Sequence, residues 1–171
     1  AGEVCVFSMA EQIKEQCQQY LSSRPAEPLA DHSASREGRD VSETVDTSQL
    51  TVGVRRAVAP DGTLGPEIVS GEPITDRKST FQAHLARISS PQEANWVLDT
   101  LLQDKRIARA THNISAWRIV RQEGDRRIVL ADNDDDGEEA AGGRLAALLE
   151  IKDVSGVIVV VSRWWGGILL G

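Results

Sequence analysis

The sequence feature that most constrains the fold is an uninterrupted run of five β-branched apolar residues, VIVVV, at 157–161. A strand with one face in water alternates apolar and polar residues, whereas a continuous apolar run needs cover on both faces. The run therefore predicts a central strand of a sheet. Because strands and helices alternate irregularly along the rest of the chain, the sequence predicts the α+β class, arranged as a two-layer sandwich.

Further strands are predicted where apolar residues alternate with polar ones, or where turn-forming residues separate short apolar runs. They fall within 51–70, over 79–88, over 114–119 and, after a hairpin turn, over 127–131. The strand over 79–88 has one apolar and one polar face, so we expect it to be half-buried, with His84 on the polar side.

Two helices are predicted in the same part of the chain. Ser90 and Glu93 have the spacing of a capping box, and Pro91 between them suits the first position of a helix. This helix is expected to end near Lys105 and Arg106, where cations complement the helix dipole. The second helix is expected over about 143–152. Its apolar positions are Leu145, Leu148, Leu149 and Ile151.

The first 50 residues differ in character from the rest. Ser8 and Glu11 also have capping-box spacing and open a helix predicted over 8–21. Residues 22–50 have no aromatic residue and are rich in Ser, Pro and charged residues, which predicts a disordered, charged linker.

Charge and cysteine content narrow the classes of function. The net charge of −7 argues against sequence-blind binding of duplex nucleic acid, although a local basic patch is compatible with it. The only cysteines, Cys5 and Cys17, do not have the spacing of a disulfide or zinc framework, so a reducing compartment is expected. No apolar run approaches the roughly 20 residues of a membrane helix, which argues against a membrane-spanning protein.

The acidic loop at 132–137, DNDDDG, has two interpretations. Asp132, Asp134, Asp136 and Gly137 match the first half of a calcium-binding loop, but Gly143 stands where the last ligand should be a glutamate. We favour the alternative that these carboxylates face the positive end of the next helix dipole and accept hydrogen bonds.

The glycines that open the same helix are also ambiguous. Gly142, Gly143 and Arg144 offer backbone amides and a cation, which together could hold an anion. The sequence has neither of the two common phosphate-loop patterns, so a simple packing role for the glycines is favoured over a nucleotide pocket. We expect no cofactor and no bound metal.

A basic, hydroxyl-rich face is the main candidate for binding. If the sheet brings its members together, they could contact phosphates of RNA or of the ribosome. The candidate residues are Arg77, Lys78, Ser79, His84, His112, Arg144 and Arg163. Alternatively, each histidine is an ordinary hydrogen-bonding residue, and Arg163 pairs with the acidic loop at 132–139, which is the interpretation we favour for that arginine. No nucleophile with a matching base can be selected, so we expect no enzymatic activity.

Two adjacent tryptophans followed by two glycines come directly after the apolar run. Successive side chains of a strand point to opposite sides, so we expect one of Trp164 and Trp165 in the core and the other at a contact surface. Gly166 and Gly167 suggest a turn where two backbones approach closely.

Four sequence blocks together resemble the IMPACT family, also called the ancient imprinted-protein family. They are DRKSTFQAH at 76–84, ATHNI at 110–114, DDDGEEAAGGRL at 134–145 and VVSRWWGGI at 160–168. The resemblance implies a fold similar to a ribosomal-protein domain and to the fourth domain of the translocation factor. The start of the chain also resembles the end of an RWD domain. These likenesses divide the chain into an RWD fragment over 1–23, a linker over 24–50 and the ancient domain over 51–171.

The resemblance implies translational control in the cytoplasm as part of a stress response. Members of the family bind the ribosome-associated activator of the amino-acid-starvation kinase and thereby repress phosphorylation of the initiation factor. The resemblance also implies actin as a partner, and it places much of the activator binding in the RWD part. Both ends of the sequence are expected to be cuts through a longer protein.

Overall fold

The computed structural model describes residues 53–58 and 63–168. The helix predicted over 8–21, the linker predicted over 24–50 and both cysteines lie outside the described residues. Within the described part, no helix is long and apolar enough to cross a membrane.

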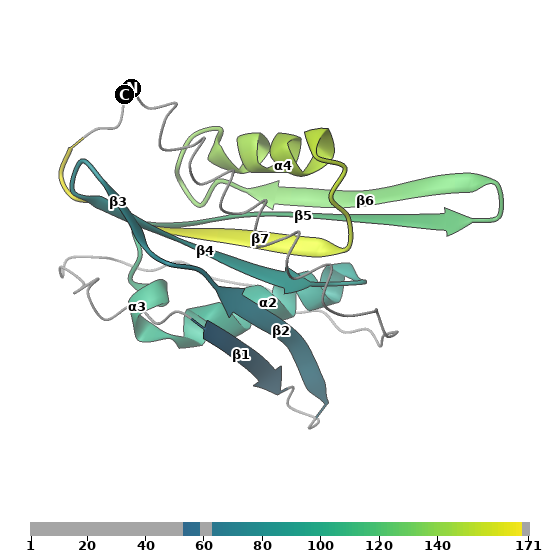
Figure 1. Cartoon of the computed structure of the whole chain (residues 1–171), viewed down its shortest axis with the longest axis horizontal. Coiled ribbons are helices and arrows are strands. Elements are labelled where there is room, and N and C mark those ends of the chain that lie inside the picture. The colour runs from purple at the N-terminus through teal and green to yellow at the C-terminus, as the bar shows by residue number, and fades with distance from the viewer. Residues whose placement is uncertain (1–52, 59–62, 169–171) are drawn as a thin grey trace.

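The strands form one antiparallel sheet of seven strands in the order β1-β2-β4-β7-β5-β6, with β3 paired to β4 at the side (Figure 1). Their bounds are β1 Gly53–Val58, β2 Leu64–Ser70, β3 Ile74–Asp76, β4 Ser79–Arg87, β5 His112–Glu123, β6 Arg126–Asp134 and β7 Val157–Trp164. Every strand predicted from the sequence is therefore present, and the strand with the continuous apolar run, β7, lies between β4 and β5.

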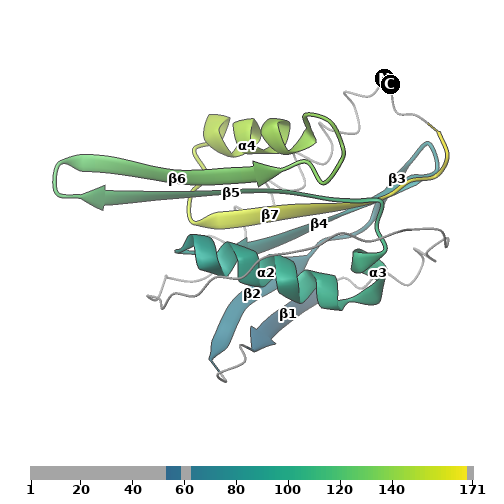
Figure 2. The same ribbon diagram turned by 180° about the vertical axis from the view of Figure 1, so that it is seen from behind.

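The helices cover both faces of this sheet. Helix α2, Pro91–Gln103, and the short helix α3, Lys105–Ala108, lie on one face, and α4, Ala141–Ile151, lies on the other (Figures 1 and 2). Alternate residues of β7 supply the two cores: Ile158 and Val160 belong to the α2 side, whereas Val159 belongs to the α4 side. The α+β class is confirmed, as is the burial of β7 on both faces. The layering differs from the expected two-layer sandwich, because α4 adds a third layer over β5, β6 and β7.

Helix α2 begins as predicted. The Ser90 side chain accepts a hydrogen bond from the Glu93 backbone amide at 3.2 Å, and the Glu93 carboxylate accepts one from the Ser89 amide at 2.8 Å. The predicted end was wrong, because α2 stops at Gln103 and Asp104 caps α3 by accepting from the Arg106 amide at 3.0 Å. The hydrogen bonds from Arg106 also hold the pKa of Asp104 below its usual range.

One prediction of burial was wrong. Strand β4 is buried on both faces and not on one, because the α2 side of the sheet covers Gln82 and His84 as well. Helix α4 buries Leu145 and Leu149 but leaves Ile151 79% exposed. Leu145 and Leu149 are four residues apart on one face of the helix, whereas Ile151 lies on the opposite face, away from the sheet.

Candidate functional site

The β3–β4 turn places two basic residues at one end of the sheet. Asp76 pairs with Ser79, so Arg77 and Lys78 form a two-residue turn, with φ angles of 44° and 66°. Turns of this kind need positive φ at both positions and usually take Asn and Gly, so the turn is strained with two bulky side chains. Lys78 is exposed at its tip, and Arg77 Nε lies 3.5 Å from Asp76 Oδ2.

The segment after β7 packs against this turn. A Cβ atom on Gly166 would lie 1.9 Å from the Lys78 carbonyl oxygen, so only glycine allows this approach, as the sequence predicted. The Gly166 amide donates to Ser79 Oγ at 3.3 Å. Ser79 is fully buried, so this candidate residue supports the turn from inside and does not contribute to an exposed face.

The two tryptophans divide as predicted. Trp164 is 6% exposed and its Nε1 donates to the Arg106 carbonyl oxygen at 3.1 Å, which fixes the core against α3. Trp165 is 54% exposed, and its backbone amide donates to Thr111 Oγ1 at 3.0 Å. An exposed indole therefore stands one residue before the glycine that contacts the basic turn.

Arg163 is an internal ion-pair partner. Its side chain is 8% exposed, its Nη1 donates to Glu138 Oε2, and its guanidinium lies 5.6 Å from the centroid of the Phe81 ring. His112 Nε2 lies 3.4 Å from the same glutamate oxygen, and His112 Nδ1 lies 2.8 Å from the Asp136 carbonyl oxygen. The preferred interpretation, that Arg163 pairs with the acidic loop, is confirmed.

His84 belongs to a buried chain of hydrogen bonds that crosses four strands. Its Nδ1 lies 2.8 Å from Ser70 Oγ, its Nε2 lies 3.3 Å from Ser162 Oγ, and that hydroxyl donates to Asn113 Oδ1 at 2.6 Å. Because the one Ser162 proton goes to Asn113, the oxygen can only accept from His84, which puts the imidazole proton on Nε2. Nδ1 then accepts from Ser70.

Burial keeps His84 uncharged. The side chain is 1% exposed, and desolvation, with a smaller effect of the Arg55 charge, lowers its pKa to about 3. A neutral, fully bonded imidazole in a core is no anion-binding group, so His84 does not join the exposed basic face.

The acidic loop caps α4. Asp135 accepts hydrogen bonds from the Ala140 amide at 3.1 Å and from the Gly142 amide at 2.6 Å, and Asp136 accepts from the Asn113 amide at 2.6 Å. This is the helix-facing role that the sequence favoured over a calcium site. Across 53–58 and 63–168, the structure has no group of three or more acidic, His or Cys side chains placed to hold a metal ion.

Of the two glycines at the start of α4, only Gly142 has the favoured packing role. A Cβ atom on Gly142 would lie 2.8 Å from the Asp134 backbone, whereas one on Gly143 would meet nothing within 4 Å. Arg144 is exposed on the first turn of α4. The structure thus brings Arg77 and Lys78 to one turn, supports that turn with Ser79, and uses His84, His112 and Arg163 in internal contacts.

These motifs match a known family. A family model described as the Impact N-terminal domain matches residues 77–171. The chain belongs to the IMPACT family. It is 58% identical over 106 residues to Protein IMPACT of Danio rerio, which covers 62% of this chain and 33% of that protein. It is 41% identical over 180 residues to Protein IMPACT of Mus musculus, which covers 99% of this chain and 55% of that protein. The chain thus spans about half or less of these IMPACT relatives.

Solved structures give two further matches. A crystal structure of a hypothetical protein matches 61% of this chain and 48% of its own at 28% identity, with a TM-score of 0.50. The structure of Yih1, described as a two-domain translational regulator, matches 81% of this chain and 47% of its own at 38% identity, with a TM-score of 0.48.

In this IMPACT-family chain, the four sequence blocks that carry the resemblance meet at one end of the sheet. Each block contributes an atom to a hydrogen bond with another block. These bonds join Gly166 to Ser79 at 3.3 Å, Trp165 to Thr111 at 3.0 Å and Asn113 to Asp136 at 2.6 Å. The family motifs therefore build one structural unit, which we call the motif end.

Sequence reasoning missed two groups of partners at the motif end. The hydrogen bonds of His84 to Ser70 and Ser162 depend on strand register. Their only signal in the sequence is that each of these polar residues stands in an otherwise apolar strand. It also did not single out Glu138 within the acidic loop as the partner of Arg163.

Proposed function

We propose that this chain is part of a translational regulator that works through protein contacts. It binds the ribosome-associated activator of the amino-acid-starvation kinase and so limits phosphorylation of the initiation factor. Membership of the IMPACT family supports this proposal. A cytoplasmic location, a role in the stress response, actin as a second partner, and the division into an RWD fragment, linker and ancient domain belong to the same proposal.

The observation that supports binding over catalysis is the use of charged groups at the motif end. Arg163 and Glu138 neutralise each other inside the fold, and His84 is held neutral in the core. The Lys78 side chain and the Trp165 indole are among the groups that the motif end exposes to solvent. A basic side chain near an exposed aromatic ring suits recognition of a second partner, separate from the activator contact that the resemblance places in the N-terminal part.

The test is capture of the purified activator by the full chain and by two variants. Ile13→Asp with Leu21→Asp alters the apolar face predicted for residues 8–21, and Lys78→Ala with Trp165→Ala alters the motif end. Because the resemblance places the contact in the N-terminal part, we expect the first pair to abolish capture and the second to leave it intact. Loss of capture only in the second pair would move the contact to the motif end. Capture unaffected by either pair would refute both placements.

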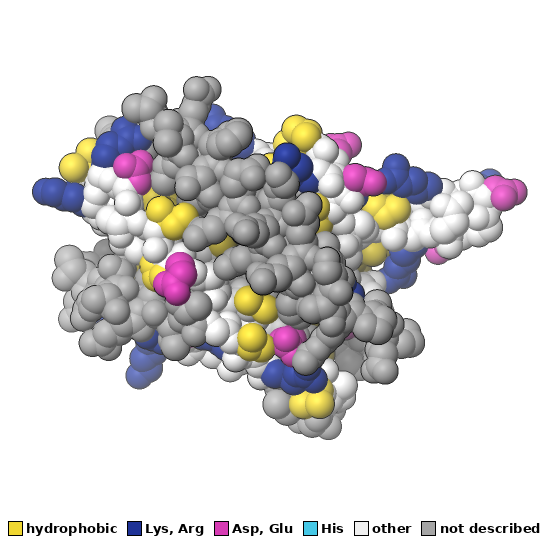
Figure 3. All heavy atoms as spheres, in the orientation of Figure 1, with side chains coloured by type: hydrophobic (Ala, Val, Ile, Leu, Met, Phe, Trp, Pro, Cys, Tyr) yellow, Lys and Arg dark blue, Asp and Glu magenta, His cyan; other side chains and the backbone are white. Residues whose placement is uncertain are grey.

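A second candidate function is binding of RNA or the ribosome through the exposed part of the motif end. Figure 3 shows Lys and Arg side chains at the end of the molecule that carries β3. Arg77, Lys78 and Trp165 combine cations with an aromatic surface on which a base can stack. Phosphate contacts make binding strongly salt-dependent, so Arg77→Ala with Lys78→Ala should weaken RNA binding and flatten its salt dependence. Binding that does not change with salt or with these variants would refute this candidate.

A further inference from the structure

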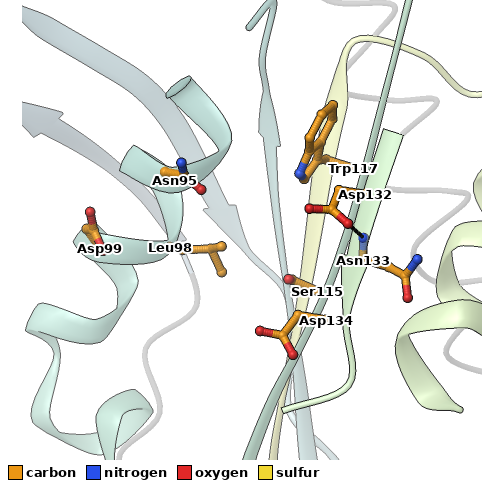
Figure 4. Close-up of a pocket in the computed structure, with 8 residues that line it drawn as sticks. All are labelled: Asn95, Leu98, Asp99, Ser115, Trp117, Asp132, Asn133 and Asp134. Carbon is orange, nitrogen blue, oxygen red and sulfur yellow. Dashed lines mark hydrogen bonds between the residues drawn. The ribbon is translucent and has the colours of Figure 1, made fainter. Parts of the chain in front are cut away.

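A groove with a volume of about 250 Å³ lies between α2 and the β5–β6 hairpin (Figure 4). Its lining includes Asn95 and Asp99 from α2, Ser115 and Trp117 from β5, and Asp132 and Asp134 from β6. The groove lies on the α2 side of the sheet, so none of the internal contacts of Arg163 or His112 with the acidic loop forms part of its lining.

The groove is acidic on both sides. Asp132 lies opposite Trp117 and Asp134 lies opposite Ser115 in the β5–β6 register, so their carboxylates face the groove with these two residues. One oxygen of each accepts a backbone amide: Asp132 Oδ1 from Asn133 and Asp134 Oδ1 from Asp136, both at 2.9 Å. The second oxygen of each carboxylate remains able to accept a hydrogen bond from a ligand.

A buried hydroxyl inside the groove has no partner in the described chain. Ser115 is 3% exposed, and none of the residues in 53–58 and 63–168 forms a hydrogen bond with its side chain. Figure 4 shows the Ser115 hydroxyl directed into the space between β5 and α2. A ligand in the groove would supply the hydrogen bond that this hydroxyl does not form within the described residues.

The indole of Trp117 lines one side of the groove. Trp117 is partly buried against the core on the α2 side, and Figure 4 shows its indole standing beside Asp132. The face of an indole attracts a cation, most of all a guanidinium or an ammonium that has lost part of its water. Carboxylates, a hydroxyl acceptor and an indole together match the chemistry of an arginine or lysine side chain.

The position of β6 adds a backbone surface. It ends the strand order of the described sheet and pairs there with β5 alone. An edge strand offers amides and carbonyls to an extended segment, and alternate side chains of that segment then reach one face of the sheet. If a segment pairs with β6, its side chains on the α2 side of the sheet reach Asp132 and Asp134.

We infer that the groove between α2 and the β5–β6 hairpin binds an arginine or lysine side chain of a partner protein, carried by an extended basic segment that lies along β6. Charge complementarity selects this occupant over nucleic acid, since phosphates would meet the carboxylates of Asp99, Asp132 and Asp134. The inference goes beyond the proposed function, because the groove lies on the α2 side of the sheet, shares only Asp134 with the motif end and does not depend on the activator.

The probe is a fluorescein-labelled peptide of alternating Thr and Arg, with a second peptide in which citrulline replaces every Arg. Citrulline keeps the shape of the side chain and removes its charge. Anisotropy with the full chain should show binding of the arginine peptide and at least tenfold weaker binding of the citrulline peptide. Asp132→Asn with Asp134→Asn keeps both backbone hydrogen bonds, and we expect it to weaken binding about tenfold.

Matched controls distinguish binding in the groove from unspecific attraction of a basic peptide to an acidic protein. Glu123→Gln with Asp125→Asn removes the same charge from the exposed hairpin and should change the affinity less than twofold. Ser115→Ala should weaken binding about threefold without lowering the melting temperature, because its hydroxyl has no partner to lose.

Several results would overturn the inference. Equal binding of the two peptides, or equal losses in the groove and hairpin variants, would leave only unspecific attraction. Tighter binding of a single-stranded oligonucleotide than of the arginine peptide, abolished by Asp132→Asn, would assign the groove to nucleic acid. Dimerisation of the chain that Asp132→Asn abolishes would assign it to a second copy. Each of these outcomes is independent of whether the activator is captured.

Discussion

His84 is a titratable residue shielded from water inside the sheet. The unfolded chain takes up a proton at this residue near pH 6.5, whereas the folded chain does so only near its lowered pKa of about 3. Between these values the unfolded state binds more protons, so the stability contributed by neutral His84 falls as the pH falls. The steepest loss from this one group is about 1.4 kcal/mol per pH unit.

His84→Gln tests this linkage. Glutamine retains a donor and an acceptor but does not titrate, so we expect it to be less stable than the wild type at pH 7.5 and to lose its disadvantage as the pH falls toward 4.5. Urea denaturation at several pH values gives the difference in unfolding free energy. Glu93 and Asp104 titrate in both proteins and therefore affect the difference little. A difference that stays constant with pH would contradict a neutral, buried His84.

Arg163 and Arg77 belong to the same predicted basic face but differ in their contacts. Arg163→Ala removes a nearly buried guanidinium together with its ion pair to Glu138 and its contact with the Phe81 ring, so it should cost about 2–3 kcal/mol. Arg77→Ala removes an ion pair whose two side chains are each about one-third exposed, and it should cost less than about 1 kcal/mol. Thermal melting of the two variants checks this, and similar melting temperatures would be the contrary result.

At the scale of the element, α4 contains a matched pair of glycines. Gly142→Ala pushes a methyl group against the Asp134 backbone and should destabilise the fold by about 1–3 kcal/mol. Gly143→Ala meets open space in the same helical turn and should stabilise it by about 0.5–1 kcal/mol. Denaturant midpoints of both variants give the signs, and the same sign for both would show that helix propensity outweighs the contact with the loop.

The elements whose signals are local could be predicted from the sequence. Ser90 and Glu93 mark the start of α2 because a cap and its amide lie within one turn of chain. The β-branched run identifies β7 because a continuously apolar strand must have both of its faces buried. The end of α2 could not be placed by the same means, because Asp104 is able to cap α3 only once that second helix exists.

The sequence predicted which residue types form the candidate site, but not which of these residues are exposed to solvent. The sequence placed His84 on a polar face and Ser79 among exposed binding residues, but both are buried by segments far away in the chain. Ser79 lies beneath Gly166, which is 87 residues further on. Side-chain alternation gives the two faces of a strand, whereas which face another element covers depends on tertiary structure.

At the scale of the whole molecule, the two cores lie on opposite faces of the same central strands, β4, β7 and β5. The α2 side and the α4 side are separate clusters of buried residues, and both draw on β7. Strand β4 and its neighbours on one side, and β5 with β6 on the other, are joined through the hydrogen bonds of β7. The seven-stranded sheet is therefore continuous only where β7 is in place.

The central position of β7 has a consequence for synthesis of the chain on the ribosome. The β5–β6 hairpin and the β2–β4 pair emerge first and can form from local contacts, but each then presents an open edge where β7 belongs. Because β7 is the last of the described strands in sequence order, both edges stay unpaired until residue 164 has left the exit tunnel. During that interval the nascent chain has two unpaired strand edges, on β4 and β5. A chaperone or a neighbouring nascent chain can bind to these edges before β7 pairs with them.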